Sequence, residues 1–158
     1  MIAIRPAGPD DLAFLFRLTE RLADFPVPPW RTRGMIARAD DAVIRTALER
    51  PDPATLLVVA TDGEGTPRGY LLATTRRDYF TGGPHGHVEI LAVEPEVEGR
   101  GIGRALLDAA DGWARSRGYD HLTLNVFAAN ERARAVYGRL GWEPELMTYR
   151  KALDREQR

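Results

Sequence analysis

The segment that most constrains the fold is a glycine-rich turn between an apolar run and an amphipathic stretch. The run His87–Val93 (HVEILAV) is typical of a buried strand, and it stops at Glu94–Pro95. Gly99, Gly101 and Gly103 follow at alternate positions. Glycine lets the backbone adopt positive φ and approach a ligand closely, and the free amides at a helix start attract anions. The segment therefore predicts a strand–turn–helix unit that binds a phosphate or pyrophosphate, with a purely geometric tight turn as the alternative.

Two common phosphate-binding motifs do not fit this turn. A P-loop requires Gly-Lys-Ser/Thr, whereas Gly103 is followed by Arg104 and Ala105. A dinucleotide fingerprint requires a small residue at position 104 or 106, and these positions hold Arg104 and Leu106. The turn is therefore neither a P-loop nor a Rossmann fingerprint.

The chain as a whole predicts one mixed α/β domain over residues 1–158, with the element order β-α-α-β-β-β-α-β-α-β. Hydrophobic periodicity, prolines and terminal glycines set the expected bounds. The expected elements are a strand at Ile2–Arg5, a helix from Asp10 or Asp11 to Leu22, a helix at Met35–Glu49 with a break near Asp40–Asp41 left open, strands at Thr55–Thr61, Arg68–Thr75 and His87–Val93, a helix at Arg104–Arg117, a strand at His121–Phe127, a helix at Asn130–Leu140 and a strand at Met147–Leu153. We expect a central mixed, mostly antiparallel sheet flanked by helices.

Composition excludes several classes of function. The 158 residues are 44% hydrophobic and carry a formal net charge of −1, which fits one compact core and argues against a nucleic-acid-binding protein. There is no cysteine, which removes disulfides, thiolate nucleophiles and cysteine-based metal sites. No signal-peptide pattern opens the chain, and no run reaches the roughly 18 apolar residues of a membrane helix. A cytoplasmic protein is therefore expected.

The glycine-rich turn and a second motif together resemble a known family. Glu98-Gly99-Arg100-Gly101-Ile102-Gly103 is similar to the acyl-CoA-binding pattern Gln/Arg-x-x-Gly-x-Gly/Ala of the GNAT superfamily of N-acetyltransferases, although Glu98 stands where the family has Gln or Arg. The segment Asn125–Tyr137 resembles the family's strand followed by an Asn-x-x-Ala-x-x-x-Tyr helix, and Leu140-Gly141-Trp142 resembles its Leu-Gly-Phe. The resemblance covers nearly the whole chain in the expected element order.

The resemblance implies a GNAT-like domain in which His87–Val93 and His121–Phe127 are parallel strands that splay apart. Pantetheine then lies in the gap and pairs with the backbone of the first strand, where an amide also polarises the thioester carbonyl. Arg100 and Arg104 would place positive charge at the pyrophosphate and offset Glu98. The implied cofactor-binding residues are Leu91, Ala92, Val93, Glu98, Gly99, Arg100, Gly101, Ile102, Gly103, Arg104, Asn130, Ala133 and Tyr137.

The implied chemistry needs a base, because an alkyl ammonium has a pKa of about 10 and must lose a proton before it attacks. Glu89 and His87 are two apart on one strand and are the candidate catalytic bases, acting directly or through water. A structural carboxylate and a surface histidine are the alternatives. Tyr137 resembles the family's general acid, which protonates the leaving thiolate; a core aromatic is its alternative. Asn130 is expected to cap the following helix, to contact the CoA arm, or to do both.

The leading hypothesis is an N-acetyltransferase that moves acetyl directly from acetyl-CoA to a primary amine of a small molecule, peptide or protein. A non-catalytic acyl-CoA-binding sensor or subunit with the same fold is the second hypothesis, and a nucleotide-binding module is the third. The expected partners are acetyl-CoA and an amine acceptor, without nucleic acid, membrane or metal, and a homodimer is left open. His85 is expected in a loop and His121 at a strand edge. Four aspartates are expected to be solvated surface acids, with attraction of a cationic amine as the alternative: Asp24, Asp40, Asp41 and Asp78.

The acceptor pocket is expected where three segments of the chain meet. These are the proline-rich loop Phe25–Trp30, the connection Arg76–Gly86 and the segment Met147–Tyr149. Its aromatic walls are expected to be Trp30, Tyr79 and Phe80.

Overall fold

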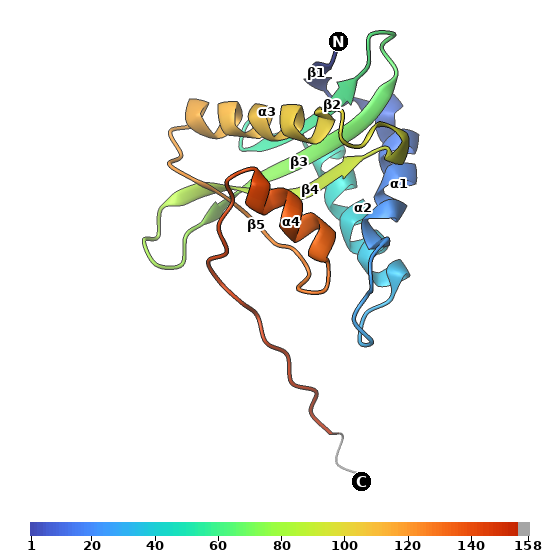
Figure 1. Ribbon diagram of the computed structural model, residues 1–158. Coiled ribbons are helices and arrows are strands. Elements are labelled where there is room, and N and C mark those ends of the chain that lie inside the picture. The colour runs from blue at the N-terminus through green and yellow to red at the C-terminus, as the bar shows by residue number, and fades with distance from the viewer. Residues whose placement is uncertain (155–158) are drawn as a thin grey trace.

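Within the described part of the chain, five strands form a single sheet whose spatial order is the order of the sequence. The computed structural model describes residues 1–154. β1 to β4 are antiparallel neighbours, whereas β5 runs parallel to β4. The sheet is therefore mixed and mostly antiparallel, as the sequence predicts (Figure 1). The strands are β1 Ala3–Pro6, β2 Thr55–Thr61, β3 Pro67–Arg77, β4 Pro84–Val93 and β5 Leu122–Leu124.

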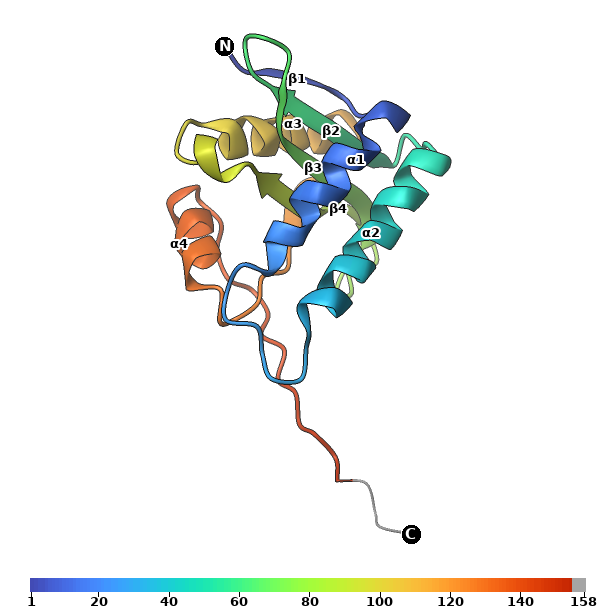
Figure 2. The ribbon, with the colours of Figure 1, turned by 90° about the vertical axis from the view of Figure 1, so that its right-hand side faces the viewer.

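Helices cover both faces of this sheet. Figure 2 shows α1 and α2 on one face and α3 on the other. The apolar core beneath α3 includes Leu71, Val88 and Leu106, and the core beneath α1 and α2 includes Leu15 and Leu72. Successive residues of β3 thus enter opposite cores, as expected for a strand that is covered on both faces. The helices are α1 Leu12–Thr19, α2 Arg33–Glu49, α3 Ile102–Ser116 and α4 Glu131–Arg139, with the short 3-10 turns η1 Pro9–Asp11, η2 Glu20–Ala23 and η3 Pro95–Val97.

A β-bulge at Glu89 changes the face to which the residues of β4 point. Val88 is paired with Ala73 and Ile90 with Leu72, so Glu89 has no partner in the ladder. Val88 packs in the core beneath α3, and Ile90 packs in the core beneath α1 and α2. The bulge directly follows the last residue of β4 that pairs with β5, and nothing in the sequence pattern indicates it.

The two parallel strands pair over three residues only. Gly86–Val88 face Leu122–Leu124, so the strand expected at His121–Phe127 is shorter than predicted. Gly86 permits this close approach, because a Cβ there would lie 2.5 Å from Cδ2 of Leu122 and 2.9 Å from Cζ3 of Trp113. Beyond Val88 none of residues 1–154 pairs with this edge of β4, which is the splayed arrangement that the family resemblance implies.

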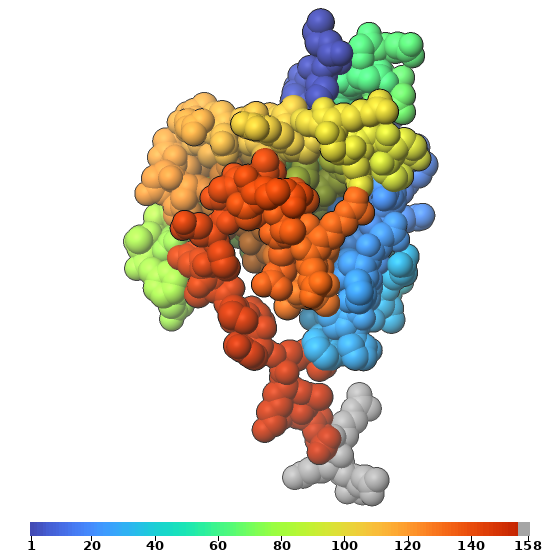
Figure 3. Space-filling view, viewed as in Figure 1, coloured from blue at the N-terminus to red at the C-terminus, as the bar shows by residue number. Residues whose placement is uncertain are grey.

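The final strand expected at Met147–Leu153 does not form. Residues 143–154 contain neither helix nor strand, and the large apolar side chains among them are exposed. Figure 3 shows this segment running away from the body of the molecule after α4. Apolar and polar residues alternate over Met147–Arg150, which is the pattern of a strand, but a strand also needs a ladder partner. The neighbouring edge strand, β5, is only three residues long.

Smaller expectations are also corrected. α2 continues unbroken through Asp40–Asp41, and α3 begins at Ile102, two residues before the expected start. β3 and β4 extend into Arg76–Gly86, which was expected to be a flexible connection, and leave only a turn at residues 78–83. None of the helices within residues 1–154 combines the length and the apolar character that membrane crossing requires.

Candidate active site

The turn before α3 presents a row of free backbone amides. Gly99 and Gly101 have φ values of 78° and 85°, which side-chain-bearing residues rarely adopt. Gly101 is the N-cap of α3, and no side chain caps the helix. Within residues 1–154, the amides of Gly99, Gly101 and residues 102–104 donate to no backbone acceptor. The helix dipole adds positive potential at the same point, so the turn has the geometry of an anion site.

The backbone groups of Leu91 and Val93 face the open edge of β4. Glu94 donates its amide to β3, and successive residues of a strand alternate in direction, so Ala92 also faces β3 while Leu91 and Val93 face the gap. Nη1 of Arg21 donates to the Val93 carbonyl at 3.0 Å. Figure 3 shows β4 in the hollow between the turn before α3 and α4. The two amides and the Leu91 carbonyl are therefore free to pair with an extended ligand.

Glu98, the departure from the family pattern, is neutralised by neighbouring arginines. Its carboxylate pairs with Arg132 of α4 and lies 3.9 Å from Nη2 of Arg21. Arg100 and Arg104 are exposed and form no ion pair within the described residues. The turn therefore keeps two cations that are available to an anion. The Glu98–Arg132 pair also connects the turn to α4 across the gap.

Glu89 is held by two side chains of β3. Oγ1 of Thr74 donates to Oε1 at 2.7 Å, and Nη2 of Arg76 lies 2.8 Å from Oε1 and 2.9 Å from Oε2. The Glu89 side chain is 18% exposed. Since each carboxylate oxygen has two lone pairs, Oε1 is saturated and Oε2 keeps one position for a water molecule or a proton. Glu89 is therefore anchored and still able to accept.

His87 and His85 share one hydroxyl group. Oγ1 of Thr123, on β5, lies 2.7 Å from Nδ1 of His87 and 3.0 Å from Nε2 of His85. A hydroxyl has one proton, so it donates to one ring and accepts from the other. Burial lowers the pKa of His87 below its usual value near 6.5, and its Nε2 makes no hydrogen bond within residues 1–154. His85, which was expected in a loop, is buried in β4.

Asn130 and Tyr137 both lie on or next to α4. Oδ1 of Asn130 accepts from the amide of Ala133 at 3.2 Å, which confirms the predicted cap. The ring of Tyr137 packs edge-on against Trp142, with centroids 6.0 Å apart, beside the core beneath α3. Burial raises the pKa of Tyr137 above the usual value of 10. Its hydroxyl has no hydrogen-bond partner within residues 1–154, so it is free for an incoming group.

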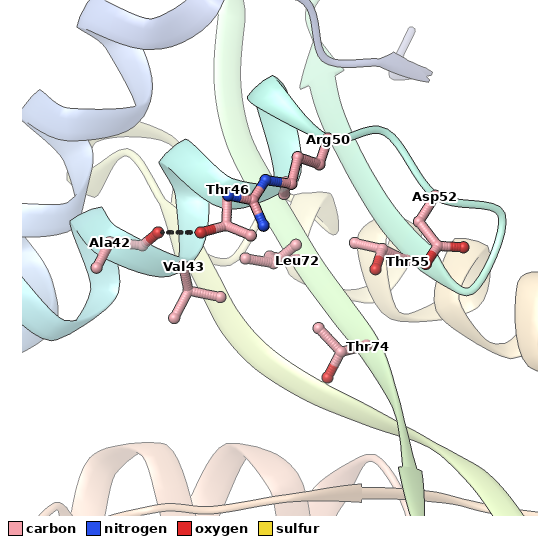
Figure 4. A pocket seen from close by; sticks show the side chains of 9 residues that line it. Ala42, Val43, Thr46, Arg50, Asp52, Thr55, Leu72 and Thr74 are labelled. Atoms are coloured by element: carbon pink, nitrogen blue, oxygen red, sulfur yellow. Dashed lines mark hydrogen bonds between the residues drawn. The ribbon is translucent and has the colours of Figure 1, made fainter.

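An acidic region lies beside Glu89 on the face of the sheet that α2 covers. A groove of about 450 Å³ runs between α2 and strands β2 and β3, and Thr74, which donates to Glu89, is one of its lining residues (Figure 4). Asp40 lies on α2, two residues before the lining residue Ala42, and is half-buried. Burial and the charges of Asp41 and Glu89 raise its pKa to about 6. Asp40 is therefore not the solvated acid that the sequence predicts.

The expected aromatic walls do not come together. Tyr79 and Phe80 are exposed and pack on each other in the β3–β4 turn. Trp30 is half-exposed and is covered by the guanidinium of Arg150, 5.0 Å from the ring centroid. The segment Met147–Tyr149 contributes exposed side chains and no enclosed wall. The sequence identified aromatic residues in loops but not their positions in space.

Three side chains that set the state of the candidate bases were missed from the sequence. Thr74 and Arg76 hold Glu89, and Thr123 bridges the two histidines. All three lie on strands next to β4 and face its residues through the strand register. The only signal that could have found them is that register, which hydrophobic patterning specifies by face and not by partner.

Comparisons with known proteins identify the family. The model of the acetyltransferase (GNAT) family matches residues 15–142. A mycothiol acetyltransferase of Propionibacterium freudenreichii subsp. shermanii is 42% identical over 104 residues, which are 66% of this chain and 32% of that protein. An aminoglycoside N(6')-acetyltransferase type 1 of Stenotrophomonas maltophilia is 32% identical over 115 residues, 70% of this chain and 74% of the relative. The chain spans about a third of the length of the mycothiol acetyltransferases that it matches.

Solved structures share the fold at low sequence identity. A GCN5-related N-acetyltransferase from Ralstonia eutropha JMP134 superposes with a TM-score of 0.74 at 23% identity, covering 96% of this chain and 99% of that one. An aminoglycoside N-acetyltransferase, AAC(6')-Iy in complex with CoA, gives a TM-score of 0.69 at 20% identity and covers 97% of this chain and 96% of its own. With the family model matching over most of the sequence, this chain belongs to the GNAT family of acetyltransferases.

Proposed function

We propose that the chain binds acetyl-CoA and transfers its acetyl group directly to a primary amine. The observation that carries this proposal is the order of groups along β4, from its open edge to the residues that pair with β5. The free amides of the turn come first, the outward backbone of Val93 and Leu91 follows, and Glu89 and His87 come last. An acyl-CoA needs an anion site, an extended partner and a base near its thioester, in this order.

The cofactor would bind mainly through the backbone. Its pyrophosphate would accept hydrogen bonds from the amides of the turn, next to Arg100 and Arg104. Its pantetheine arm would pair with Leu91 and Val93 as an added strand. A relative with this fold is named as a complex with CoA, which supports acyl-CoA as the ligand class. Asn130 and Ala133 would border the same arm from the start of α4.

The reaction would proceed by direct attack. The amine nitrogen bonds to the thioester carbon, an amide of β4 stabilises the developing oxyanion, and the C–S bond breaks to release the thiolate. The proton of the ammonium passes to Glu89 or His87, directly or through water. The chain has no cysteine to hold the acetyl group, so no acyl–thioenzyme intermediate is proposed.

Tyr137 would assist the departing sulfur mainly by hydrogen bonding. A thiol has a pKa of about 8.5, and burial holds the pKa of Tyr137 above 10. The phenol therefore holds its proton more tightly than a free thiol does, and complete proton transfer to the thiolate is unfavourable. The hydroxyl therefore stabilises charge on the sulfur as it develops, and solvent supplies the proton when CoA leaves.

The acidic residues of α2 favour a cationic acceptor. Asp40 lies in the electrostatic field of Asp41 and Glu89, and the two aspartates directly precede Ala42 and Val43, which line the groove. An acceptor with a second ammonium group would neutralise this charge and present its first amine to the base. One relative is named an aminoglycoside N(6')-acetyltransferase, and aminoglycosides carry several ammonium groups. We therefore propose polycationic small molecules as the acceptor class.

A thiol-release assay with acetyl-CoA tests this function. We expect turnover with aminoglycosides or polyamines and less with neutral amino-acid esters or peptide N-termini. Thermal shift with acetyl-CoA, CoA and ATP accompanies the assay. Stabilisation by ATP alone would contradict the acyl-CoA site, and stabilisation by acetyl-CoA without any turnover would indicate a binding module. In the same assay Glu89→Gln and His87→Asn distinguish the two bases, since loss of the acting base lowers kcat.

A further inference from the structure

Three side chains from separate parts of the chain meet at the end of the sheet where β4 and β5 begin. Asp78 lies in the β3–β4 turn, His85 at the start of β4 and His121 directly before β5; Figure 1 shows these segments at one end of the sheet. One ligand atom from each side chain lies within 4.8 Å of the others. The sequence indicated no metal site, because these residues are far apart in the chain and none of them forms a recognisable motif.

The side chains of Asp78 and His121 each have one polar atom in a hydrogen bond and a second polar atom with no hydrogen bond within residues 1–154. Oδ1 of Asp78 accepts from the amides of Phe80 and Thr81, both at 2.8 Å. Oδ2 of Asp78 lies 3.7 Å from Nε2 of His121. Nδ1 of His121 lies 2.5 Å from Oδ1 of Asp120. The two remaining atoms, Oδ2 and Nε2, therefore face each other from oriented side chains.

His85 also has one ring nitrogen in a hydrogen bond and one without a partner among the described residues, and its side chain is buried. The residue is 6% exposed, and its Nε2 is bonded to Thr123. Its Nδ1 is buried and has no hydrogen-bond partner within residues 1–154. An unpaired buried polar atom destabilises the folded state, so such atoms usually have a ligand or a function.

We propose that Asp78, His85 and His121 bind a divalent transition-metal ion of the zinc class through Oδ2, Nδ1 and Nε2. Two imidazoles and one carboxylate form the protein ligand set of zinc sites that keep a fourth position for water. The contacts of His121 with Asp120 and of His85 with Thr123 are those that orient metal-bound imidazoles.

Binding requires a small rearrangement that the exposed partner can make. The rings of His85 and His121 are stacked, with centroids 4.7 Å apart and planes at 12°. Both lone pairs can reach one ion only if a ring turns, and the His121 side chain is 40% exposed. Bonds of about 2.0–2.1 Å place tetrahedral ligand atoms about 3.3 Å apart, so the three atoms draw together by at most about 1.5 Å.

An ion bound at this site would influence the proposed transfer site through the hydrogen bonds of the Thr123 hydroxyl. With Nδ1 on the metal, His85 carries its proton on Nε2 and donates to Thr123. The hydroxyl of Thr123 then donates to Nδ1 of His87, so that His87 carries its proton on Nε2. Any effect on catalysis depends on the proposed function, whereas binding of the ion does not.

Calorimetric titration of the full, tag-free chain with zinc chloride tests the site after treatment with a chelator. We expect one ion per chain. His121→Ala and Asp78→Asn each remove a ligand near the surface and should weaken the affinity for Zn²⁺ at least ten-fold. Asp108→Asn, which changes an exposed acid on α3, should leave it unchanged. Equal affinity in the wild type and both ligand variants would overturn the proposal.

Nitrogen NMR of the histidine rings gives a second readout that does not depend on variants. Added Zn²⁺ should shift Nδ1 of His85 and Nε2 of His121 and should place the proton of the His87 ring on Nε2. Shifts confined to the exposed His121, with His85 unaffected, would show an adventitious surface ion and would overturn the buried site. Thermal unfolding of His121→Ala checks that this variant is folded.

Discussion

The part of the chain up to α3 and the part after it are built differently. Within β1–β4 and α1–α3, Leu15, Leu71, Leu72 and Leu106 are fully buried. α4 contains no fully buried residue, and the apolar side chains after residue 145 are exposed. The proposed site divides along the same line, because the amides of the turn and the β4 edge belong to the first part and Tyr137 to the second. One wall of the site is held by a packed core, and the other by a few local contacts.

The contacts of the second part are individually weak but well placed. Asn130 caps α4, Tyr137 packs on Trp142, and Glu98 pairs with Arg132 across the gap. Such caps and exposed pairs each contribute on the order of 1 kcal/mol or less. The difference teaches that the proposed thioester-binding edge is held by a packed core, whereas Tyr137, which we propose to meet the sulfur, is held by a few local contacts.

The largest expected effect comes from a substitution that disrupts the packing of the first part of the chain. Leu106→Ala opens a cavity under α3 and should lower the free energy of unfolding by about 3 kcal/mol, because the residue is fully buried. Leu140→Ala, at the end of α4, should cost under about 1 kcal/mol, because that side chain is 36% exposed. Denaturant unfolding measures both, and equal costs would remove the contrast between the two parts.

A second change separates chemistry from stability in the second part. Tyr137→Phe should lower kcat about ten- to hundred-fold, since a hydrogen bond to a charged sulfur is lost, and should leave the KM for acetyl-CoA nearly unchanged. Stability should hardly change, because the hydroxyl has no partner within residues 1–154. Tyr149→Phe, on an exposed side chain, is the matched control. An unaltered kcat would leave Tyr137 as a packing residue.

The same division marks what the sequence could predict. The strand–turn–helix unit, its free amides and the Asn130 cap follow from residues close together in the chain, and they were predicted with small errors in their bounds. The pairs Arg76–Glu89 and Thr123–His87 depend on register between strands, which local pattern does not specify. Glu89 adds a bulge that shifts the register itself.

The prediction of a final strand is wrong for a related physical reason. Apolar and polar residues alternate over Met147–Arg150, yet strand formation requires a partner edge, and residues 143–154 have none in this structure. Likewise Asp40 follows a helical pattern that places it at the surface, whereas its half-buried position beside Glu89 is set by how α2 lies on the sheet. Local propensity predicted the elements, and packing decided the environment of each side chain.

The raised pKa of Asp40 predicts how the stability of the first part of the chain depends on pH. Its pKa is about 6 in the folded chain and near 3.8 when unfolded, so the folded state holds the proton more tightly. The stability contributed by this group is complete below about pH 4 and is lost as the pH rises through 6. Asp40→Asn should therefore raise the free energy of unfolding by about 1 kcal/mol at pH 8, after allowance for partial exposure, and change it little at pH 4.

Thermal unfolding at the two pH values measures this effect, with Asp108→Asn as the exposed control. A gain of the same size at both pH values would show that the charge of Asp40 is not the cause. If Asp40 also attracts the cationic acceptor, the stabilised variant should have a higher KM for that acceptor. The wild-type residue would then lower stability in favour of binding.

The smallest expected effect lies on the ion pair that joins the two parts. Glu98→Gln removes a negative charge beside the proposed pyrophosphate site and releases Arg132 and Arg21 from the carboxylate. Affinity for CoA should rise about three-fold at low salt, and the gain should disappear near 0.5 M salt because exposed charges are screened. Glu96→Gln, on the exposed turn η3, should change the affinity less. A loss of CoA affinity in Glu98→Gln would instead mean that the pair positions α4 for binding, and that the second part of the chain is more firmly tied to the first than its burial indicates.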